Sequence, residues 1–586
     1  MPIQSRFLAI VLLVVGLAPF SFAQSGGSSQ QQPGGITGLT IHVNNPNGTQ
    51  TNVPTTPAPA PSGGVSPIAE ANQLFMQRKI PEAAAKYQAV VRANPKAAPA
   101  QVGLIRCLLL MNKVDEAQVA AKSAMEVLPT SPQVLATAAD VQFRMGNIPQ
   151  AEQLFVKAEN LDPKNPEPYL GLARIYKAYS LYRRAYDNLK RAHEIAPDNG
   201  PVQMVYFHSL PQPDQIPALE SYLAKANLNP QMERTLQAYL AFLKKNAAAP
   251  VHACKLVSKV EQTDTKLNPV ARAGSALGGV GLNVNINKQT VRLALDTGAT
   301  GILLGRATAE KLGLQRLGYQ PIIGMGDAGT QGGFTAVADR IRIGDLEFQD
   351  CVVKVTDAAT PVTGQDGLIG ADVFSSYLID IDIPGAKLRL SPLPKRPNEN
   401  AQPATLQTMT SEQSEDSENE AEGPKTSSGL TDLPQDAYVA PEMKDWTKVY
   451  RFRSLLLIPT YVDRTGPHLF LIDTGSFSNI LSTRTAQQVT QIRSNPAMRV
   501  TGMSGSVSQV YTADKASLQF GRYVQENEDM TTFDISNITR QTGTEVGGIL
   551  GFKMLCILQV QIDYRDGLVN FIFNPHRLPK QVRIGH

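Results

Sequence analysis

The tripeptide Asp-Thr-Gly occurs twice in this 586-residue chain, each time at the end of an apolar run. The first copy is residues 296–298 and the second is residues 473–475. A Gly-hydrophobic-hydrophobic-Gly segment follows each copy and ends at Gly370 and Gly551, 74 and 78 residues beyond the two aspartates. Because motif and spacing recur together, the sequence predicts one folding unit that is present twice.

The residues before each triplet are typical of a short β-strand. Segments 291–295 and 469–472 are rich in large apolar residues and lead directly into the aspartate. Gly298 and Gly475 allow a sharp turn and a close approach of one loop to the other. The hydroxyls of Thr297 and Thr474 are expected to hydrogen-bond buried backbone across the pseudo-dyad.

Two nearby carboxylates supply the chemistry that peptide hydrolysis requires. Held roughly 3 Å apart they cannot both ionise, so they share one proton and titrate as a pair. One carboxylate then activates water while the other protonates the leaving amide. We therefore expect Asp296 and Asp473 to be catalytic. Residue 299 is Ala where Ser476 stands in the second copy, so the loops are not equivalent and the sequence does not assign base and acid.

Both halves resemble units of the retropepsin-like aspartic protease family, over residues 278–393 and 451–575. A hairpin precedes each triplet, at 281–289 and 456–462, and a strand pair closes each half, at 379–390 and 560–571. The resemblance implies an all-β, bilobal, pepsin-like fold that corresponds to a single-chain form of the retroviral homodimer. It also implies that Thr297, Gly298, Thr474, Gly475 and Ser476 support the active-site loops.

Glycine-rich flaps cover the cleft in this family. The candidates lie 28 and 29 residues past the aspartates, in the segments 324–329 and 502–506. They contain Gly324, Met325, Gly326, Gly502, Met503 and Gly505. A flap would exclude water and hold the substrate backbone. The alternative is that both segments are ordinary hairpin turns.

A second repeat, with a period of 34 residues, precedes the protease-like region. Prolines 95, 129, 163 and 197 share this spacing, and so do alanines 83, 117, 151 and 185. Small residues suit positions where helices cross, and proline ends a helix. The pattern resembles the tetratricopeptide repeat (TPR). The resemblance implies an all-α solenoid of four repeats over residues 64–199, continued by helices to residue 248, with a concave surface for a protein partner.

The remaining segments complete the predicted domain organisation. Residues 1–23 have a basic residue, a short apolar run and a small-residue site, which predicts a cleaved secretory signal and a periplasmic or extracellular protein. The apolar run is too short to span a membrane. Residues 24–64 and 396–445 are predicted flexible linkers, the second one acidic. The two lobes are expected at 270–395 and 446–580.

Composition excludes other classes of function. The net charge of +4 is small and the basic residues are spread out, so nucleic-acid binding has no support. Four scattered cysteines, at 107, 254, 351 and 556, do not indicate a disulfide framework, and Cys107 is expected to be a buried apolar residue. Seven histidines show no metal-ligand pattern, so no metal and no cofactor is predicted.

The sequence thus predicts an exported aspartic endopeptidase that acts on polypeptides, with repeats that recruit a substrate or a protein partner. Two alternatives remain open. The protease-like part can be an inactive scaffold that leaves binding to the repeats, although both Asp-Thr-Gly triplets are intact. Alternatively, each half can pair with the same half of a second chain, although the linker gives the local partner a high effective concentration.

Overall fold

The computed structural model describes residues 66–577, except 211, 226–227, 229, 248–251, 253, 273–274, 358–363 and 398–434. The predicted signal, the first linker and most of the second linker therefore lie outside the described residues. The chain divides into two compact units, with the boundary between residues 137 and 138, inside helix α6 (Pro132–Arg144). Each unit is described by itself.

The first unit contains helices α2 (Pro67–Met76), α3 (Ile80–Ala93), α4 (Ala98–Leu110), α5 (Val114–Val127) and the start of α6. The side chain of Ser66 accepts a hydrogen bond from the Ala69 N–H, and proline occupies the first turn of α2. Ala83 and Ala117 are completely buried. Cys107 is buried and free in α4, as expected. Small residues therefore occupy the predicted helix crossings.

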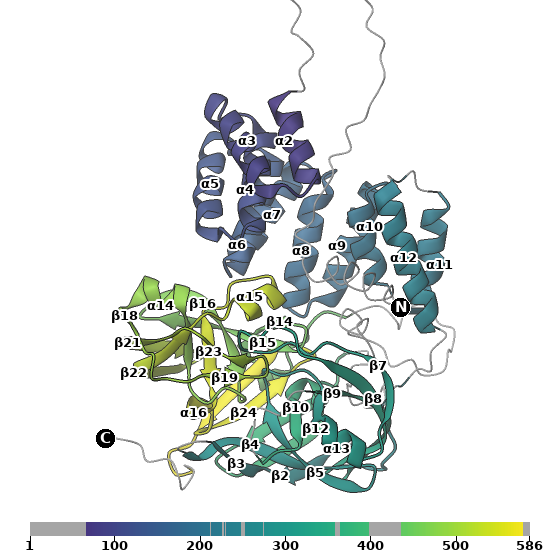
Figure 1. Cartoon of the computed structure of the whole chain (residues 1–586), viewed down its shortest axis with the longest axis vertical. Coiled ribbons are helices and arrows are strands. Elements are labelled where there is room, and N and C mark those ends of the chain that lie inside the picture. The colour runs from purple at the N-terminus through teal and green to yellow at the C-terminus, as the bar shows by residue number, and fades with distance from the viewer. Residues whose placement is uncertain are drawn as a thin grey trace, which may run out of the picture. The chain divides into compact units, whose positions relative to one another are not determined.

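The remaining repeat helices belong to the second unit: α7 (Ile148–Leu161), α8 (Pro166–Ala178) and α9 (Tyr182–Ile195). Helices α3, α5, α7 and α9 begin at residues 80, 114, 148 and 182, so the 34-residue period predicted from the sequence is confirmed. Three further helices, α10 (Gly200–His208), α11 (Gln212–Leu223) and α12 (Pro230–Ala247), pack around Phe207, Leu219, Leu236 and Leu243 (Figure 1).

The first lobe is a nine-stranded sheet in the order β1-β9-β6-β10-β5-β4-β8-β7, with β3 paired to β4. Helix α13 (Arg306–Lys311) and the 3-10 helix η1 (Ala371–Phe374) follow β6 and β10. The strands are β1 (Lys255–Leu256), β3 (Asn268–Arg272), β4 (Ser275–Ile286), β5 (Gln289–Asp296), β6 (Ile302–Gly305), β7 (Gln315–Tyr319), β8 (Gly333–Ile343), β9 (Leu346–Thr356) and β10 (Gly367–Gly370).

The second lobe is an eight-stranded sheet with a matching plan, in the order β14-β15-β16-β23-β17-β22-β21-β18. Helices α14 (Thr483–Val489), α15 (Ser536–Thr542) and α16 (Phe552–Leu555) lie between its strands. The strands are β14 (Tyr450–Phe452), β15 (Leu455–Val462), β16 (Thr465–Asp473), β17 (Ile480–Ser482), β18 (Ile492–Ser494), β21 (Val510–Phe520), β22 (Tyr523–Phe533) and β23 (Gly548–Gly551).

A six-stranded sheet joins the two lobes within one chain. Its order is β13 (Thr447–Lys448), β25 (Leu568–Phe573), β24 (Leu558–Asp563), β11 (Tyr377–Asp382), β12 (Lys387–Pro392) and β2 (Thr263–Lys266). The closing strands of the two halves, β11 and β24, are hydrogen-bonded to each other. One buried apolar core includes residues from both lobes. The predicted fold class, a helical repeat array followed by an all-β bilobal unit, is confirmed.

Two predicted boundaries are wrong. The first lobe begins before residue 270, because β1 pairs with β9 and β2 completes the six-stranded sheet. The second lobe begins before residue 446: Ala440 and Met443, around the short helix η2 (Pro441–Met443), pack against Leu568. Both segments are short and polar, so their fixed positions come from pairing with distant strands.

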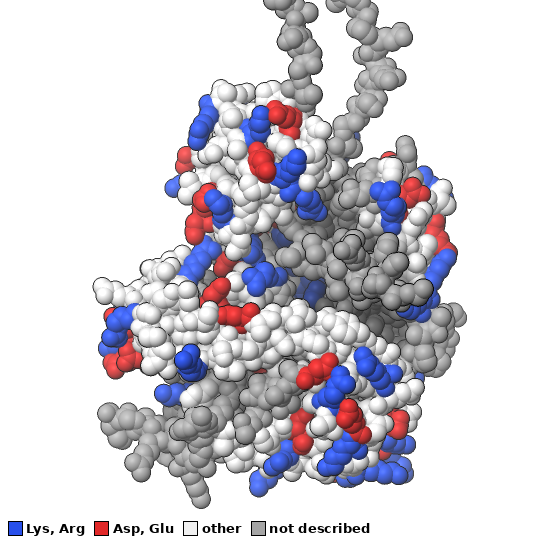
Figure 2. Space-filling view, viewed as in Figure 1, with Lys and Arg blue, Asp and Glu red and all other residues white. Residues whose placement is uncertain are grey.

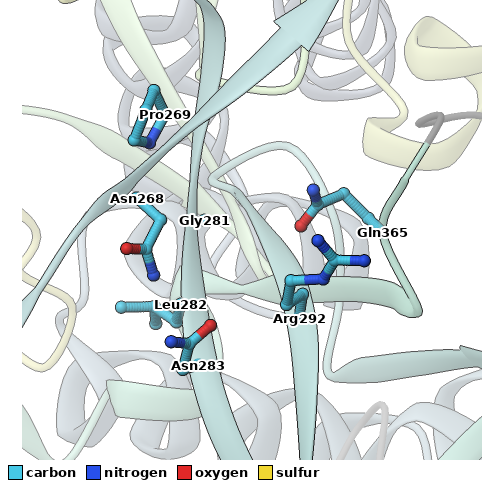
Figure 3. Close-up of a pocket in the computed structure, with 7 residues that line it drawn as sticks. All are labelled: Asn268, Pro269, Gly281, Leu282, Asn283, Arg292 and Gln365. Carbon is cyan, nitrogen blue, oxygen red and sulfur yellow. The ribbon is translucent and has the colours of Figure 1, made fainter.

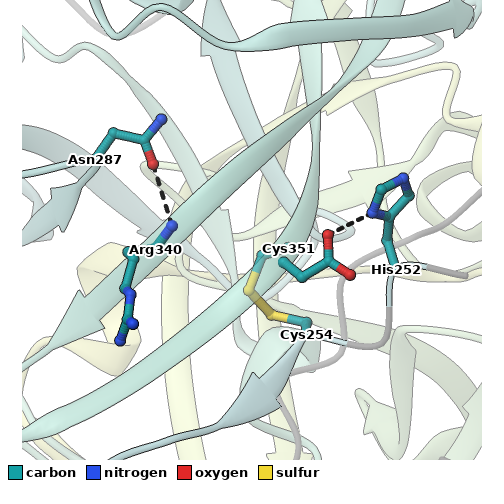
Figure 4. The surroundings of a disulfide bond; sticks show 6 residues. His252, Cys254, Asn287, Arg340 and Cys351 are labelled. Carbon is teal, nitrogen blue, oxygen red and sulfur yellow. Dashed lines mark hydrogen bonds and ion pairs between the residues drawn. A yellow bond between two sulfur atoms is a disulfide. The ribbon is translucent and has the colours of Figure 1, made fainter. Parts of the chain in front are cut away.

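Cysteine pairing also differs from the expectation. A disulfide joins Cys254 to Cys351, 97 residues apart in sequence (Figure 4). Next to it, His252 Nδ1 lies 2.5 Å from a carboxylate oxygen of Asp350. The pairing of β1 with β9 brings the two cysteines together, and no spacing pattern in the sequence indicates it. Cys556 is buried and free.

The surface carries charges of both signs. On the face drawn in Figure 2, lysine and arginine side chains are interspersed with aspartate and glutamate side chains. Among the described helices, none combines the length and apolarity that crossing a membrane requires.

Candidate active site

Each Asp-Thr-Gly loop begins where a central strand ends. Strand β5 ends at Asp296 and β16 ends at Asp473. The Gly-hydrophobic-hydrophobic-Gly segments form β10 and β23, which run parallel to these strands and place Gly370 opposite Asp296 and Gly551 opposite Asp473. The two sequence motifs of each half are therefore adjacent in space.

The two loops hold each other through four buried hydrogen bonds. The Thr297 N–H donates to Thr474 Oγ1 at 3.0 Å, and the Thr474 N–H donates to Thr297 Oγ1 at 2.9 Å. The hydroxyl of Thr297 donates to the Ile472 carbonyl at 2.8 Å, and that of Thr474 donates to the Leu295 carbonyl at 2.9 Å. The expected threonine contacts across the pseudo-dyad are present.

Each carboxylate lies against the glycine of the opposite loop. A Cβ atom at Gly298 would be 2.7 Å from Cγ of Asp473, and a Cβ atom at Gly475 would overlap the carboxylate of Asp296. The N–H groups of Gly298 and Gly475 donate to the aspartates of their own loops at 2.9 and 2.8 Å. Only glycine fits, because any side chain would occupy the space between the two carboxylates.

The two halves of the site are not equivalent. Asp473 is buried, whereas Asp296 is half-buried. Ser476 donates its hydroxyl to the Ser478 carbonyl at 3.2 Å, and Ala299 in the first loop has no hydroxyl. The environments of the two carboxylates therefore differ.

The flap candidates of the two lobes meet each other. In the second lobe, β19 (Thr501–Gly502) and β20 (Gly505–Ser506) form a small hairpin. The Ser504 N–H donates to the Met325 carbonyl at 2.8 Å, and the Ala328 N–H donates to the Ser504 carbonyl at 2.7 Å. Asp327 accepts the Ser508 N–H at 2.7 Å, and hydrogen bonds from Ser508 hold the pKa of the Asp327 carboxyl below its usual value. The flap tips are joined.

The flap glycines have a packing role that sequence reasoning missed. A Cβ atom at Gly324 would overlap the side chain of Met503, and one at Gly502 would lie 2.8 Å from Cβ of Met325. Each methionine therefore packs on the glycine of the opposite flap. The matched offsets of the two segments were the signal that could have indicated this pairing.

Helix α15 contacts the first flap and the repeat helices of the same compact unit. Asn537 donates from its side chain to the Gly324 carbonyl at 3.2 Å. Arg144, in the last turn of α6, donates to the Thr539 carbonyl at 3.2 Å, and Thr544 donates to the Phe143 carbonyl at 2.6 Å. Sequence reasoning did not identify any of these residues.

Asp372 is a buried acid behind the first active-site loop. Its two carboxylate oxygens accept the Gly301 N–H at 3.0 and 3.1 Å. Burial raises the pKa of Asp372 to about 6, despite this hydrogen bond. The group is therefore a structural acid that titrates at mildly acidic pH. Its position two residues after Gly370 is the one sequence feature that could have indicated it.

A polar hollow of about 280 Å³ lies on strands β3, β4 and β5 (Figure 3). Asn268 and Asn283 face Arg292 and Gln365 across it. Neither active-site aspartate lines this hollow, so it is separate from the carboxylate pair. Among the described residues, no group of histidine, cysteine and acidic side chains could hold a metal ion.

Comparison with known proteins agrees with both parts of the chain. Residues 282–373, within the first lobe, match the aspartyl protease family model, and residues 74–140 match the tetratricopeptide repeat model. The structure of a thermophilic TPR protein from Thermus thermophilus is 18% identical to this chain, covers 30% of it and 97% of that protein, and has a TM-score of 0.26. That TM-score carries no argument about the fold. No protein of curated function matches the chain. The chain thus joins tetratricopeptide repeats to an aspartyl protease domain.

Proposed function

We propose that this protein is an aspartic endopeptidase that hydrolyses peptide bonds with water held between Asp296 and Asp473. The observation that carries the proposal is the reciprocal grip of Thr297 and Thr474, which fixes the two Asp-Thr-Gly loops as one unit. An isolated loop would have one carboxylate. The paired loops supply two, each against the glycine of the other.

The chemistry follows from a shared proton. One ionised carboxylate accepts a proton from water as the water attacks the scissile carbonyl, and the protonated partner donates to the leaving amide. The flaps must open to admit a polypeptide, because Ser504 is hydrogen-bonded to Met325 and Ala328 across the cleft. Closure over the substrate then excludes bulk water.

The repeat helices are proposed to recruit a polypeptide substrate or a protein partner, as such arrays present a concave binding surface. Export to the periplasm or the cell exterior, directed by residues 1–23, is part of the same proposal. The Cys254–Cys351 disulfide supports it, because structural disulfides persist in oxidising compartments.

The test uses the full chain and an unfolded generic protein substrate over a range of pH. Wild type should produce peptides, and the variants Asp296→Asn and Asp473→Asn should produce none. Peptide release by both variants at the wild-type rate would refute the proposal and favour a binding scaffold.

A further inference from the structure

A small apolar cluster separate from the main core lies beside Asp296. Its members are five buried residues, and the half-buried Met503 packs against them; they are Val270, Ala294, Leu303, Ile322 and Leu368. Ala294 is two residues before Asp296, and Ile322 is two residues before the flap glycine Gly324. The cluster therefore extends from the catalytic strand to the base of the first flap.

The strand register shows which way this cluster faces. Leu368 of β10 pairs with Ala294 of β5 and with Leu303 of β6. Their chain neighbours Leu295 and Ile369 belong to the main core. Since successive side chains of a strand point to opposite faces of a sheet, Ala294, Leu303 and Leu368 face away from that core, toward the flaps.

Val270 reaches this wall from a strand outside the region that matches the protease family. It lies on β3, whereas the match begins at residue 282. Val270 pairs with Gly279 on β4, and a Cβ atom at Gly281 would be 3.2 Å from its Cγ2. Gly281 in turn pairs with Ala294. Two small residues therefore leave the space that the valine fills.

The second lobe has no such residue at the matching place. The position two residues before Asp473 is Leu471, a larger side chain than Ala294. The corresponding hairpin strand, β14, carries Arg451, which donates to the Tyr564 carbonyl at 3.0 Å and to the Tyr182 hydroxyl at 3.2 Å. The two sides of the cleft therefore differ in how their apolar walls are built.

Met503 is the movable part of the cluster. It belongs to the flap of the second lobe, whereas the other members are fixed on strands of the first lobe or at the base of its flap. A methionine side chain is flexible and fills irregular apolar gaps. When the flaps part, Met503 leaves an apolar site that a substrate side chain of similar size can take.

We propose that Val270 sets the depth of an apolar substrate pocket beside Asp296, which Met503 occupies in the closed protein. The strand β3 thereby determines which side chain is accepted on one side of the scissile bond. This inference rests on the proposed endopeptidase activity for its meaning, but the pocket can be tested by binding alone.

The binding experiment uses the full-length Asp296→Asn chain, with and without Val270→Ala, immobilised and exposed to a mixed-sequence peptide pool. Mass spectrometry of the retained peptides gives the residue preference. Val270→Ala deepens the pocket and should raise retention of Phe and Leu over Ala by roughly tenfold, whereas Val270→Leu should lower it, since one methylene in an apolar pocket changes selectivity by about 10 to 200-fold.

The matched control is Val284→Ala, which removes the same atoms from a valine of β4 in the main core. It should lower the melting temperature and leave the residue preference unchanged. If Val270→Ala also leaves the preference unchanged, the pocket assignment is wrong.

A cleavage experiment separates the two proposals. If wild type cleaves peptides, Val270→Ala should change the preferred residue on one side of the cleaved bond only. An equal increase for every peptide would show that β3 blocks the cleft as a plug, which overturns the proposal. If wild type cleaves nothing, the proposed activity fails, and the binding preferences still decide whether Val270 shapes a pocket.

Discussion

Thr297 and Thr474 each donate a backbone N–H to the hydroxyl of the other, at 3.0 and 2.9 Å. Each hydroxyl also donates to a carbonyl of the opposite strand end. Because all four groups are buried, removing one hydroxyl leaves partners that water cannot reach. The two loops should therefore lose their relative position when either threonine loses its hydroxyl.

The variant Thr297→Val should lower the free energy of unfolding by about 1 to 3 kcal/mol, because it leaves the Thr474 N–H without its acceptor. Peptide hydrolysis should fall as well, since the carboxylates lose their alignment. Thr297→Ser keeps the hydroxyl and serves as the control, measured by denaturant unfolding and by turnover. Equal losses in both variants would point to the methyl group instead of the hydrogen bonds.

Asp296→Asn and Asp473→Asn should each abolish turnover without unfolding the protein. Asparagine keeps a carbonyl oxygen that can accept the Gly298 or Gly475 N–H, so the loop geometry should survive. Each change also removes repulsion between like charges, so stability at neutral pH should stay level or rise. Thermal melts beside hydrolysis assays check both statements. Wild-type activity in either variant would contradict the shared-proton mechanism.

Asp372 should make stability depend on pH. Burial raises its folded pKa to about 6 from a usual value of 3.8, so the folded protein binds more protons than the unfolded chain between these values. This contribution to stability is full below pH 4 and is lost as the pH rises through 6. Asp372→Asn should therefore gain about 1 to 3 kcal/mol relative to wild type between pH 4 and 7.

The measurement for Asp372 is a series of denaturant melts from pH 4 to 7. The matched variant Asp339→Asn, at an exposed position on β8, should keep the pH profile of wild type. Parallel profiles for Asp372→Asn and wild type would show that Asp372 does not titrate in this window.

The Cys254–Cys351 disulfide should stabilise the protease unit. It closes a loop of 97 residues, and removing a disulfide from a folded protein typically costs about 2 to 5 kcal/mol. A reductant should lower the melting temperature of wild type and have no effect on the Cys254→Ser, Cys351→Ser double variant. A reductant effect of equal size in both proteins would assign it to another cause.

A chain that starts near residue 265 should be unstable. It would lack β1, Cys254 and the first residues of β2, together with Arg144 and Tyr182, which hydrogen-bond to the second lobe. A chain starting at residue 138 retains all of these. We expect the longer chain to be soluble and to melt at a higher temperature. Equal melting temperatures would show that the protease unit is independent of the repeat helices.

Several features of this protein follow from the sequence alone. The 34-residue period predicts helices at 80, 114, 148 and 182, because the pattern that packs one repeat against the next recurs in the chain. The paired triplets predict a two-lobed unit, because one carboxylate cannot supply both an acid and a base. The equal offsets of the glycine segments at 324 and 502 predict matching flaps. All these signals are local motifs at fixed spacing.

Only the tertiary structure decides the contacts between distant residues. Cys254 meets Cys351 because β1 pairs with β9. Val270 lies beside Ala294 because β3 folds back on β4. These contacts depend on strand register and on which small residues leave space, and neither is encoded in the type or spacing of the residues themselves. The sequence by itself therefore determines which residues form the carboxylate pair, and the fold determines what surrounds it.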